Sequence, residues 1–248
     1  MAKEKYRNKP LVDFMLDLET FSMESDACII SISCIKFNRY SPKTSYTPDE
    51  TFYVTIDATS CGMLGMHFDM DTVNRWKQQS ANARKDFFQR ENIHICKALP
   101  MLTEFINKWC DTLQGDACIW VQGQDFDIPI LRNAYFRMFE HEGKIPRSKW
   151  RDYLPWSYTN VRDARTTTKL LASIYFDRPN IPARDTDELI AEDEKRLGLR
   201  KDGKFTDDWN AHNALGDCIH SAYCVSYLFR AITSVYDTFK TEHPRKEE

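Results

Sequence analysis

Two carboxylates interrupt an apolar run near the start of the chain, in the segment FMLDLETF at 14–21. Asp17 and Glu19 are two residues apart, and side chains at that spacing point to the same face of a β-strand. Neighbouring carboxylates in apolar surroundings raise each other's pKa unless a cation lies between them. Oxygen ligands of this kind suit Mg²⁺ or Mn²⁺. The alternative is an ordinary strand whose end exposes both acids to water.

A third acid, Asp127, follows the apolar stretch ACIWV and lies near the predicted start of a helix. Helix capping explains an acid at that position equally well, and Asp125 competes for the same capping role. Gly123, a few residues earlier, permits the close approach of the chain or of a ligand.

The segment AHNALGDC adds a fourth acid, Asp217, five residues after His212. A histidine with a pKa near neutrality can act as a general base on water, although a single histidine is also common on surfaces and in cores. Four carboxylates and one histidine from three separate segments match the needs of a two-metal phosphodiester site. The joint pattern is far more specific than any of its parts.

The elements around these residues predict an α/β protein with a mixed sheet flanked by helices. Three strands with short connections come first, which indicates an antiparallel meander, and a later buried strand runs directly into a helix. The strands are predicted near 11–19, 27–38, 50–57 and 117–124. Helices are predicted over 69–79 with Asp71 as N-cap, and over 82–90, 98–113, 125–139, 164–176, 186–199 and 213–239. The acidic run 185–194 is expected to form a solvated face.

Residues 1–248 are expected to form one domain with short flexible tails, since neither repeats nor low-complexity tracts divide the chain. The formal net charge of -3 gives no overall basic surface for nucleic acid, so local cations or bound metals would be needed. The eight cysteines form no C-x-x-C pair, which argues for buried thiols and against a zinc site. A soluble protein of a reducing cytoplasm is expected, because no signal peptide or membrane-spanning stretch is apparent.

The three motifs resemble those of the DEDDh 3′-5′ exonucleases, the superfamily of ribonuclease T and the proofreading exonucleases. LDLET is similar to the first motif, GQDFDIPIL to the second and AHNALGDC to the third, so the resemblance extends over most of the chain. It implies a ribonuclease H-like fold and two Mg²⁺ or Mn²⁺ ions per site. It also implies that the metal ligands are Asp17, Glu19, Asp127 and Asp217, with His212 as the general base.

Further features resemble one branch, the exonuclease A group of tailed phages and its bacterial exoribonuclease-like relatives. The segments TVNRWKQQSANAR and LPWSYTNVRDARTT carry this resemblance, whereas the second motif departs from the commoner His-Asn-x-x-Phe-Asp. A phage-encoded protein would act in the host cytoplasm. The substrate contacts that the resemblance implies are Leu18, Thr20, Phe21, Trp76, Gln79, Phe126, Trp156 and Arg165.

The region 141–170 has seven basic and three acidic residues, interleaved with Trp150, Tyr153, Trp156 and Tyr158. Cations and aromatic rings in this arrangement are typical of grooves that bind single strands, although the rings could instead belong to the core. The leading hypothesis is a two-metal 3′-5′ exonuclease that releases nucleoside 5′-monophosphates from single-stranded ends, with DNA favoured. The alternatives are an exoribonuclease with the same mechanism and a non-catalytic nucleic-acid-binding module.

Overall fold

A five-stranded mixed sheet forms the centre of the protein. The computed structural model describes residues 9–79, 91–179, 181, 183–199 and 213–242. The strand order is β3-β2-β1-β4-β5, with β2 antiparallel to both β1 and β3, and with β4 parallel to both β1 and β5. The predicted ribonuclease H-like mixed sheet with an antiparallel start is therefore confirmed. The strands are β1 (Leu11–Thr20), β2 (Ile29–Phe37), β3 (Thr51–Thr55), β4 (Asp116–Val121) and β5 (Val161–Asp163).

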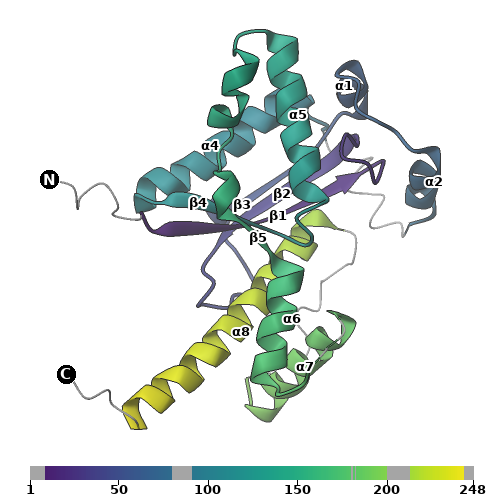
Figure 1. Ribbon diagram of the computed structural model, residues 1–248. Helices are drawn as coiled ribbons and strands as arrows, with labels where there is room; N and C mark the ends of the chain where they lie inside the picture. The colour runs from purple at the N-terminus through teal and green to yellow at the C-terminus, as the bar shows by residue number, and fades with distance from the viewer. Residues whose placement is uncertain (1–8, 80–90, 180, 182, 200–212, 243–248) are drawn as a thin grey trace, which may run out of the picture.

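Helices pack on both faces of this sheet, as Figure 1 shows. One face carries α4 and α5, whereas the other carries the long helix α8, with α6 and α7 packed beside it. The helices are α1 (Ala58–Met63), α2 (Met70–Gln78), α4 (Ile95–Leu113), α5 (Asp127–Glu142), α6 (Ala164–Tyr175), α7 (Ala183–Arg196) and α8 (Ala214–Glu242). None of the helices in the described part of the chain is both long enough and apolar enough to cross a membrane.

The alternation of side chains along β1 divides the core into two layers. Phe14, Leu16 and Leu18 are buried in the layer beneath α4 and α5, whereas Met15 packs with residues of α8. A strand that is buried on both faces needs the nearly continuous apolar sequence of this segment. The same alternation places Asp17 and Glu19 on the α8 side of the sheet.

The connection between α5 and α6 is built from short turns. It contains the 3-10 helices η3 (Arg147–Tyr153) and η4 (Tyr158–Asn160), in a region without regular predicted elements. Trp150 and Trp156 are buried here, whereas Tyr153 and Tyr158 are 56% and 82% exposed. Two of the four rings therefore belong to the core and two face solvent, and the contact of the exposed rings with a single strand stays a prediction.

Two expectations from the sequence differ from the structure. Helix α2 is capped by Asp69 rather than by the predicted Asp71, because the Asp69 carboxylate accepts hydrogen bonds from the N–H groups of Asp71 and Thr72. The acidic segment of α7 is helical, but Asp193 and Glu194 are 4% and 1% exposed and do not lie on a solvated face. The predicted helix 82–90 and the expected flexible ends at 1–8 and 243–248 lie outside the described residues.

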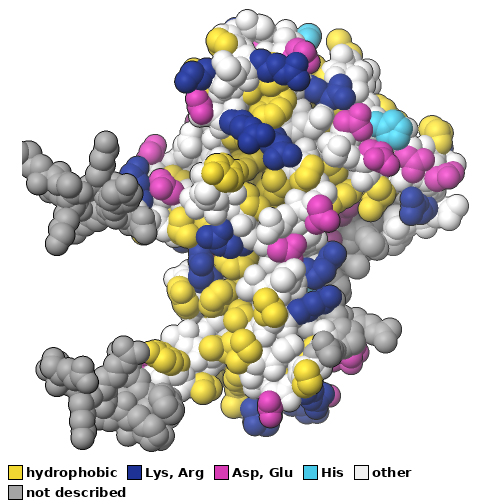
Figure 2. Space-filling model, viewed as in Figure 1, with side chains coloured by type: hydrophobic (Ala, Val, Ile, Leu, Met, Phe, Trp, Pro, Cys, Tyr) yellow, Lys and Arg dark blue, Asp and Glu magenta, His cyan; other side chains and the backbone are white. Residues whose placement is uncertain are grey.

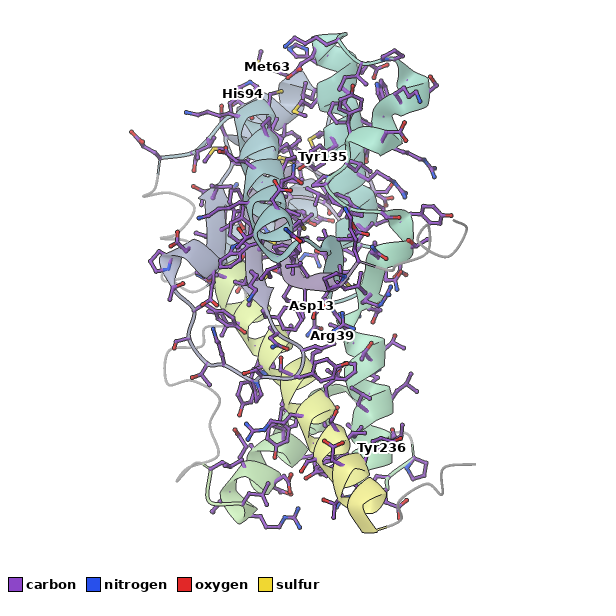
Figure 3. The ribbon with its side chains drawn as sticks, turned by 90° about the vertical axis from the view of Figure 1, so that its left-hand side faces the viewer. Asp13, Arg39, Met63, His94, Tyr135 and Tyr236 are labelled. Carbon is purple, nitrogen blue, oxygen red and sulfur yellow. The ribbon has the colours of Figure 1, made fainter. Side chains whose placement is uncertain are left out.

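An ion pair is buried near the start of β1, at the end of the strand opposite to Asp17 and Glu19 (Figure 3). Asp13 is 6% exposed, and Arg39 from the end of β2 donates to both of its carboxylate oxygens, with an Nε–Oδ2 distance of 2.8 Å. The indole N–H of Trp120 also donates to this carboxylate, at 2.8 Å. The charge of Asp13 is thus satisfied entirely by groups of the protein.

Candidate active site

Strand β1 and the first turn of α8 bring three carboxylates together. One carboxylate oxygen from each of Asp17, Glu19 and Asp217 lies within 4.8 Å of the others. Near the start of α8, the Gln122 amide at the end of β4 donates to the Ser221 hydroxyl at 2.8 Å. This bond ties the helix to the sheet one turn beyond Asp217, which helps to hold its carboxylate over β1.

Asp127 enters the same site from the opposite face of the sheet. It is the first residue of α5, is 2% exposed, and its Oδ1 accepts a hydrogen bond from the backbone N–H of Leu18 at 3.2 Å. It is not the N-cap, which is Phe126 and makes no side-chain capping bond. The preceding turn contains Gly123 at φ 116°, a conformation that favours glycine. The carboxylate is thus held against β1 at Leu18, close enough for its charge to raise the pKa of both Asp17 and Glu19.

The electrostatics of this cluster fit a bound cation. Burial, followed by the charges of Asp127, Glu19 and Asp217, raises the pKa of Asp17 well above its usual value. Burial and the Asp217 and Asp127 charges raise the pKa of Glu19 to about 8. Carboxylates that destabilise one another's charged form in this way are stabilised by a divalent ion with hard oxygen ligands.

Asp127 has a pKa raised to about 7, chiefly by burial. The Leu18 N–H and the nearby Arg165 guanidinium oppose that rise. The donor set of four carboxylates therefore suits Mg²⁺ or Mn²⁺, and Asp17, Glu19, Asp127 and Asp217 are the residues that would hold them.

Asp163, at the end of β5, organises the neighbouring loop. Its carboxylate accepts from the backbone N–H of Gln124 at 3.0 Å and of Thr166 at 2.6 Å. Although burial raises the pKa of this carboxyl group, the two N–H groups hold it below its usual value. The negative charge thereby orders the turn that precedes Asp127 and the start of the helix that carries Arg165.

Several of the predicted substrate contacts lie around the first motif. The Trp76 indole donates to the backbone carbonyl of Thr20 at 2.9 Å, which fixes α2 beside the end of β1. The ring of Phe21 lies 6.2 Å from that of Phe68, and Gln79 ends α2. The Thr20 side chain is buried and donates to the Ser22 carbonyl at 2.6 Å.

The Leu18 side chain is 4% exposed and packs in the core beneath α4 and α5, because it points away from the face that carries Asp17 and Glu19. The substrate contact predicted for Leu18 stays a prediction. Only its backbone takes part in the site, through the bond to Asp127. The predicted general base His212 lies outside the described residues.

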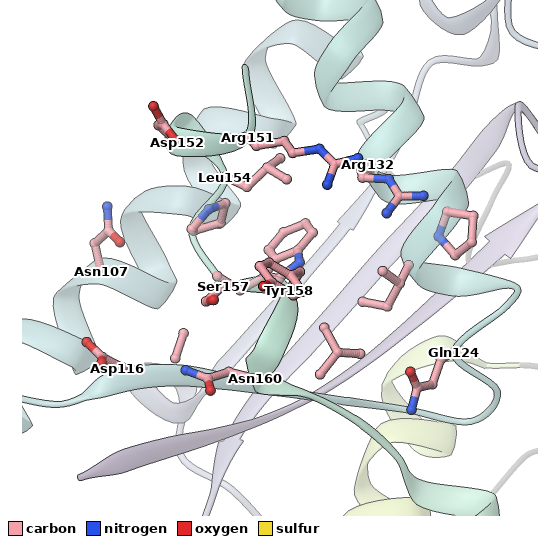
Figure 4. Close-up of a pocket in the computed structure, with 16 residues that line it drawn as sticks. Asn107, Asp116, Gln124, Arg132, Arg151, Asp152, Leu154, Ser157, Tyr158 and Asn160 are labelled. Carbon is pink, nitrogen blue, oxygen red and sulfur yellow. The ribbon is translucent and has the colours of Figure 1, made fainter. Parts of the chain in front are cut away.

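A cavity of ≈ 800 Å³ opens beside the start of α5 (Figure 4). Its wall begins at Gln124 and Ile128, next to Asp127, and continues to Arg132 and Arg151, which lie on the same side of the cavity. Its lining also includes Trp156, Tyr158 and Asn160. Figure 2 shows Lys and Arg side chains around an apolar hollow in the upper half of this face.

Sequence reasoning missed Arg132 in this cavity, although a signal was present. Ile128, the first residue after Asp127, and Arg132 are four residues apart on α5. They therefore share one face of the helix, and both line the cavity. Trp156 is 7% exposed and contributes to the base of the cavity, with its ring 5.8 Å from that of Tyr135.

Comparisons with known proteins show the family to which the chain belongs. The model of the family described as 3′-5′ exoribonuclease Rv2179c-like domain matches residues 12–229, so the chain belongs to this family. It is a 3′-5′ exonuclease of the DEDDh superfamily, as predicted, and that membership implies dependence on a divalent metal.

Among curated proteins, the chain is 24% identical over 245 residues to an exodeoxyribonuclease of Enterobacteria phage T4, and the match covers 96% of each chain. Solved structures give weaker similarities. The RNase domain of the yeast Pop2 protein has a TM-score of 0.49 at 11% identity, covering 87% of this chain and 76% of that one. The nuclease domain of 3′hExo, bound to rAMP, has a TM-score of 0.45 at 10% identity, covering 88% and 92%. Similarities at this level add nothing to the family assignment.

Proposed function

We propose that this protein is a two-metal-dependent exonuclease that hydrolyses single-stranded nucleic acid, with DNA favoured, from the 3′ end to nucleoside 5′-monophosphates. The observation that carries the proposal is the convergence of Asp17, Glu19 and Asp217 within 4.8 Å, with Asp127 held against β1. These buried acids raise one another's pKa, and cations bound between them would stabilise their charged forms.

In this mechanism the four carboxylates would hold two Mg²⁺ or Mn²⁺ ions. When bound, the ions activate a water molecule and stabilise the charge that develops on the phosphate. His212 takes a proton from the attacking water, which is the role that the motif resemblance implies. The bond that breaks joins the phosphorus to the 3′ oxygen of the preceding nucleotide. The phosphate therefore stays on the released nucleoside as a 5′-monophosphate.

The cavity beside Asp127 is proposed to receive the strand that leads to the reacting phosphate. Arg132 and Arg151 supply positive charge for the backbone, and the exposed ring of Tyr158 offers a surface for base stacking. The Arg165 charge lowers the pKa of Asp127 and would also attract the phosphate at the reacting end. Trp76, Gln79, Phe21, Thr20 and Phe126 are proposed to surround the terminal nucleotide.

The choice between DNA and RNA rests on the relatives. The phage T4 relative is an exodeoxyribonuclease that aligns along almost the entire chain, which supports DNA. The family description refers to exoribonucleases, which supports RNA as the alternative substrate. A family match that spans residues 12–229 also supports one exonuclease domain over 1–248. All eight cysteines are free thiols, which supports a reducing cytoplasm, that of the host if the protein is phage-encoded.

The decisive experiment compares wild type, Asp17→Ala and Glu24→Gln on end-labelled oligonucleotides with Mg²⁺ or Mn²⁺. Glu24 is an exposed acid just beyond β1 and serves as the matched control. We expect wild type and the control to shorten the strand from its 3′ end and release nucleoside 5′-monophosphates, whereas Asp17→Ala does not. Equal degradation by wild type and Asp17→Ala, or none by either, contradicts the mechanism. Parallel DNA and RNA substrates decide between the two alternatives.

A further inference from the structure

A second cluster of metal-binding side chains lies between α7 and α8, away from the carboxylates of the active site. Asp187 comes from α7, whereas His220 and Cys224 are one turn apart on α8. One ligand atom from each residue lies within 4.8 Å of the other two. This set of one oxygen, one nitrogen and one sulfur differs in chemistry from the all-oxygen cluster of the active site.

The distances in this cluster are close to the ligand spacing around a zinc ion, with the sulfur and the ring nitrogen approaching different oxygens of the Asp187 carboxylate. The Cys224 sulfur lies 3.5 Å from Asp187 Oδ1 and 3.8 Å from His220 Nε2, and Nε2 lies 3.5 Å from Asp187 Oδ2. Zinc with ordinary bond lengths to sulfur, nitrogen and oxygen places its ligands about 3.4–3.6 Å apart. The thiol donates to Asp187 Oδ1, whereas the nitrogen–oxygen distance is longer than a normal hydrogen bond.

The three groups also do not form a proton relay. Both the thiol and the carboxylate approach the same ring nitrogen, His220 Nε2, whereas a relay needs one partner on each nitrogen of the ring. Donor groups from three residues that lie within 4.8 Å of one another instead fit a cation bound among them.

We infer that Asp187, His220 and Cys224 form a zinc site with three protein ligands. Asp187 is 40% exposed and His220 is 11% exposed, so the buried sulfur is at the base of the site and the carboxylate is at its entrance. This exposure provides the path by which the ion enters and leaves the fourth position open for water.

The proton balance of zinc binding is simple. Without metal, the Cys224 thiol donates its hydrogen to the Asp187 carboxylate. Zinc binds the thiolate, so this proton passes to solvent as the metal–sulfur bond forms. The Asp187 carboxylate loses its hydrogen-bond donor at the same step and binds the metal instead.

The site would fasten α7 to α8, the helix that carries Asp217. These helices already share hydrogen bonds from tyrosine hydroxyls, since Tyr223 donates to Glu194 and Tyr227 donates to Asp193. The expectation that this chain has no zinc site rested on the lack of C-x-x-C pairs. The His-x-x-x-Cys spacing on one helical face was overlooked, and its third ligand is distant in the sequence.

Cobalt substitution of the full-length protein tests this site. The protein is stripped of metal and titrated with Co²⁺, and the near-ultraviolet absorption from thiolate to cobalt is recorded. Oxygen ligands give no such band, so the active-site carboxylates do not interfere. We expect the band to saturate at one equivalent and to be abolished by added Zn²⁺, independently of nuclease activity.

Two variants and a control identify the ligands. Cys224→Ser should abolish the band, and Asp187→Asn should weaken zinc affinity roughly tenfold or more. Cys110→Ser removes a half-buried thiol outside the cluster and should leave both properties unchanged. Asp187→Asn changes a partly exposed side chain, so it remains informative if Cys224→Ser does not fold. Absence of the band in wild type, or an unchanged zinc affinity in Asp187→Asn, overturns the inference.

Discussion

The two ends of β1 bury acids in opposite ways. At the start of the strand, Asp13 is surrounded by donors, with the Arg39 guanidinium on both oxygens and the Trp120 indole beside it. At the far end, every charged neighbour among the described residues that shifts the pKa of Asp17 is another carboxylate, and all of them raise it. One strand thus contains one acid that the protein itself neutralises and a pair that it does not.

This contrast separates structural acids from functional ones. A buried carboxylate paired with an arginine has its charge balanced whenever the chain is folded, so it contributes to the fold without any added component. Buried carboxylates that face each other repel, which lowers the free energy of unfolding until a cation from solution binds between them. Such a cost is tolerated where the cation is needed for function.

The largest effect should come from Asp17→Asn. We expect this variant to lose about 10³-fold in single-turnover exonuclease rate, since a metal ligand supports several kcal/mol of charge stabilisation. The metal-free variant should be at least as stable as wild type, because a repelling charge has been removed. Thermal unfolding in a chelator measures this second property. A clear loss of metal-free stability would contradict the contrast between the two ends.

Asp13→Asn should show the reverse pattern. Removing the carboxylate leaves the Arg39 charge buried, and we expect the free energy of unfolding to fall by about 3 kcal/mol. Nuclease activity per folded molecule should change little. Asp116→Asn is the control, because the exposed Asp116 only approaches Lys9 at 3.8 Å and should cost less than about 1 kcal/mol. Similar losses in both variants would show that the Asp13 pair is not a structural ion pair.

Metal-free protein should lose stability as the pH rises from about 5 to 8. The pKa values of Glu19 and Asp127 are raised to about 8 and about 7, so the folded state holds protons that the unfolded state has released. The free energy of unfolding therefore falls through this window, by an amount of the order of a few kcal/mol. Urea unfolding at several pH values, with and without saturating Mg²⁺, measures it. Stability that is flat or rising without metal would refute the prediction.

The smallest effects should come from the cavity that contains Arg132 and Arg151. Each change to alanine should raise the KM for single-stranded substrate a few-fold, with little effect on kcat. Each change should also reduce the salt dependence of binding by about one counterion. Lys108→Ala is the control, since Lys108 is exposed on α4 and pairs with Asp49 at 3.3 Å. A control variant with the same salt dependence as the arginine variants would show that the cavity does not bind the strand.

Much of the architecture follows from the order of apolar segments, but some side-chain positions do not. The alternation that groups Asp17 with Glu19 also turns Leu18 toward the opposite layer, so its burial could have been inferred from the same rule. The bond from the Leu18 N–H to Asp127 joins residues 109 positions apart, and no local pattern encodes it.

The acidic part of α7 shows why composition misleads. Asp193 is buried because the hydroxyls of Tyr175 and Tyr227, from α6 and α8, donate to its carboxylate at 2.8 Å. An acidic run is assigned to solvent unless its partners are known, and here those partners come from two other helices. The α2 cap differs for a simpler reason, since aspartate is an acceptable cap at either position and the extended backbone of Asp69 places its carboxylate on the first N–H groups of the helix.

Helix α8 also sets the distance between the two clusters, because it carries a residue of each. Asp217 and Cys224 are seven residues apart, so they are separated by about 10 Å along the axis and lie within about 20° of each other around it. Salt screens buried charges less than exposed ones, so an ion at one position would weaken the binding of a second ion at the other. A single rigid helix would thus keep a hard cation and a thiolate-bound cation at a constant spacing.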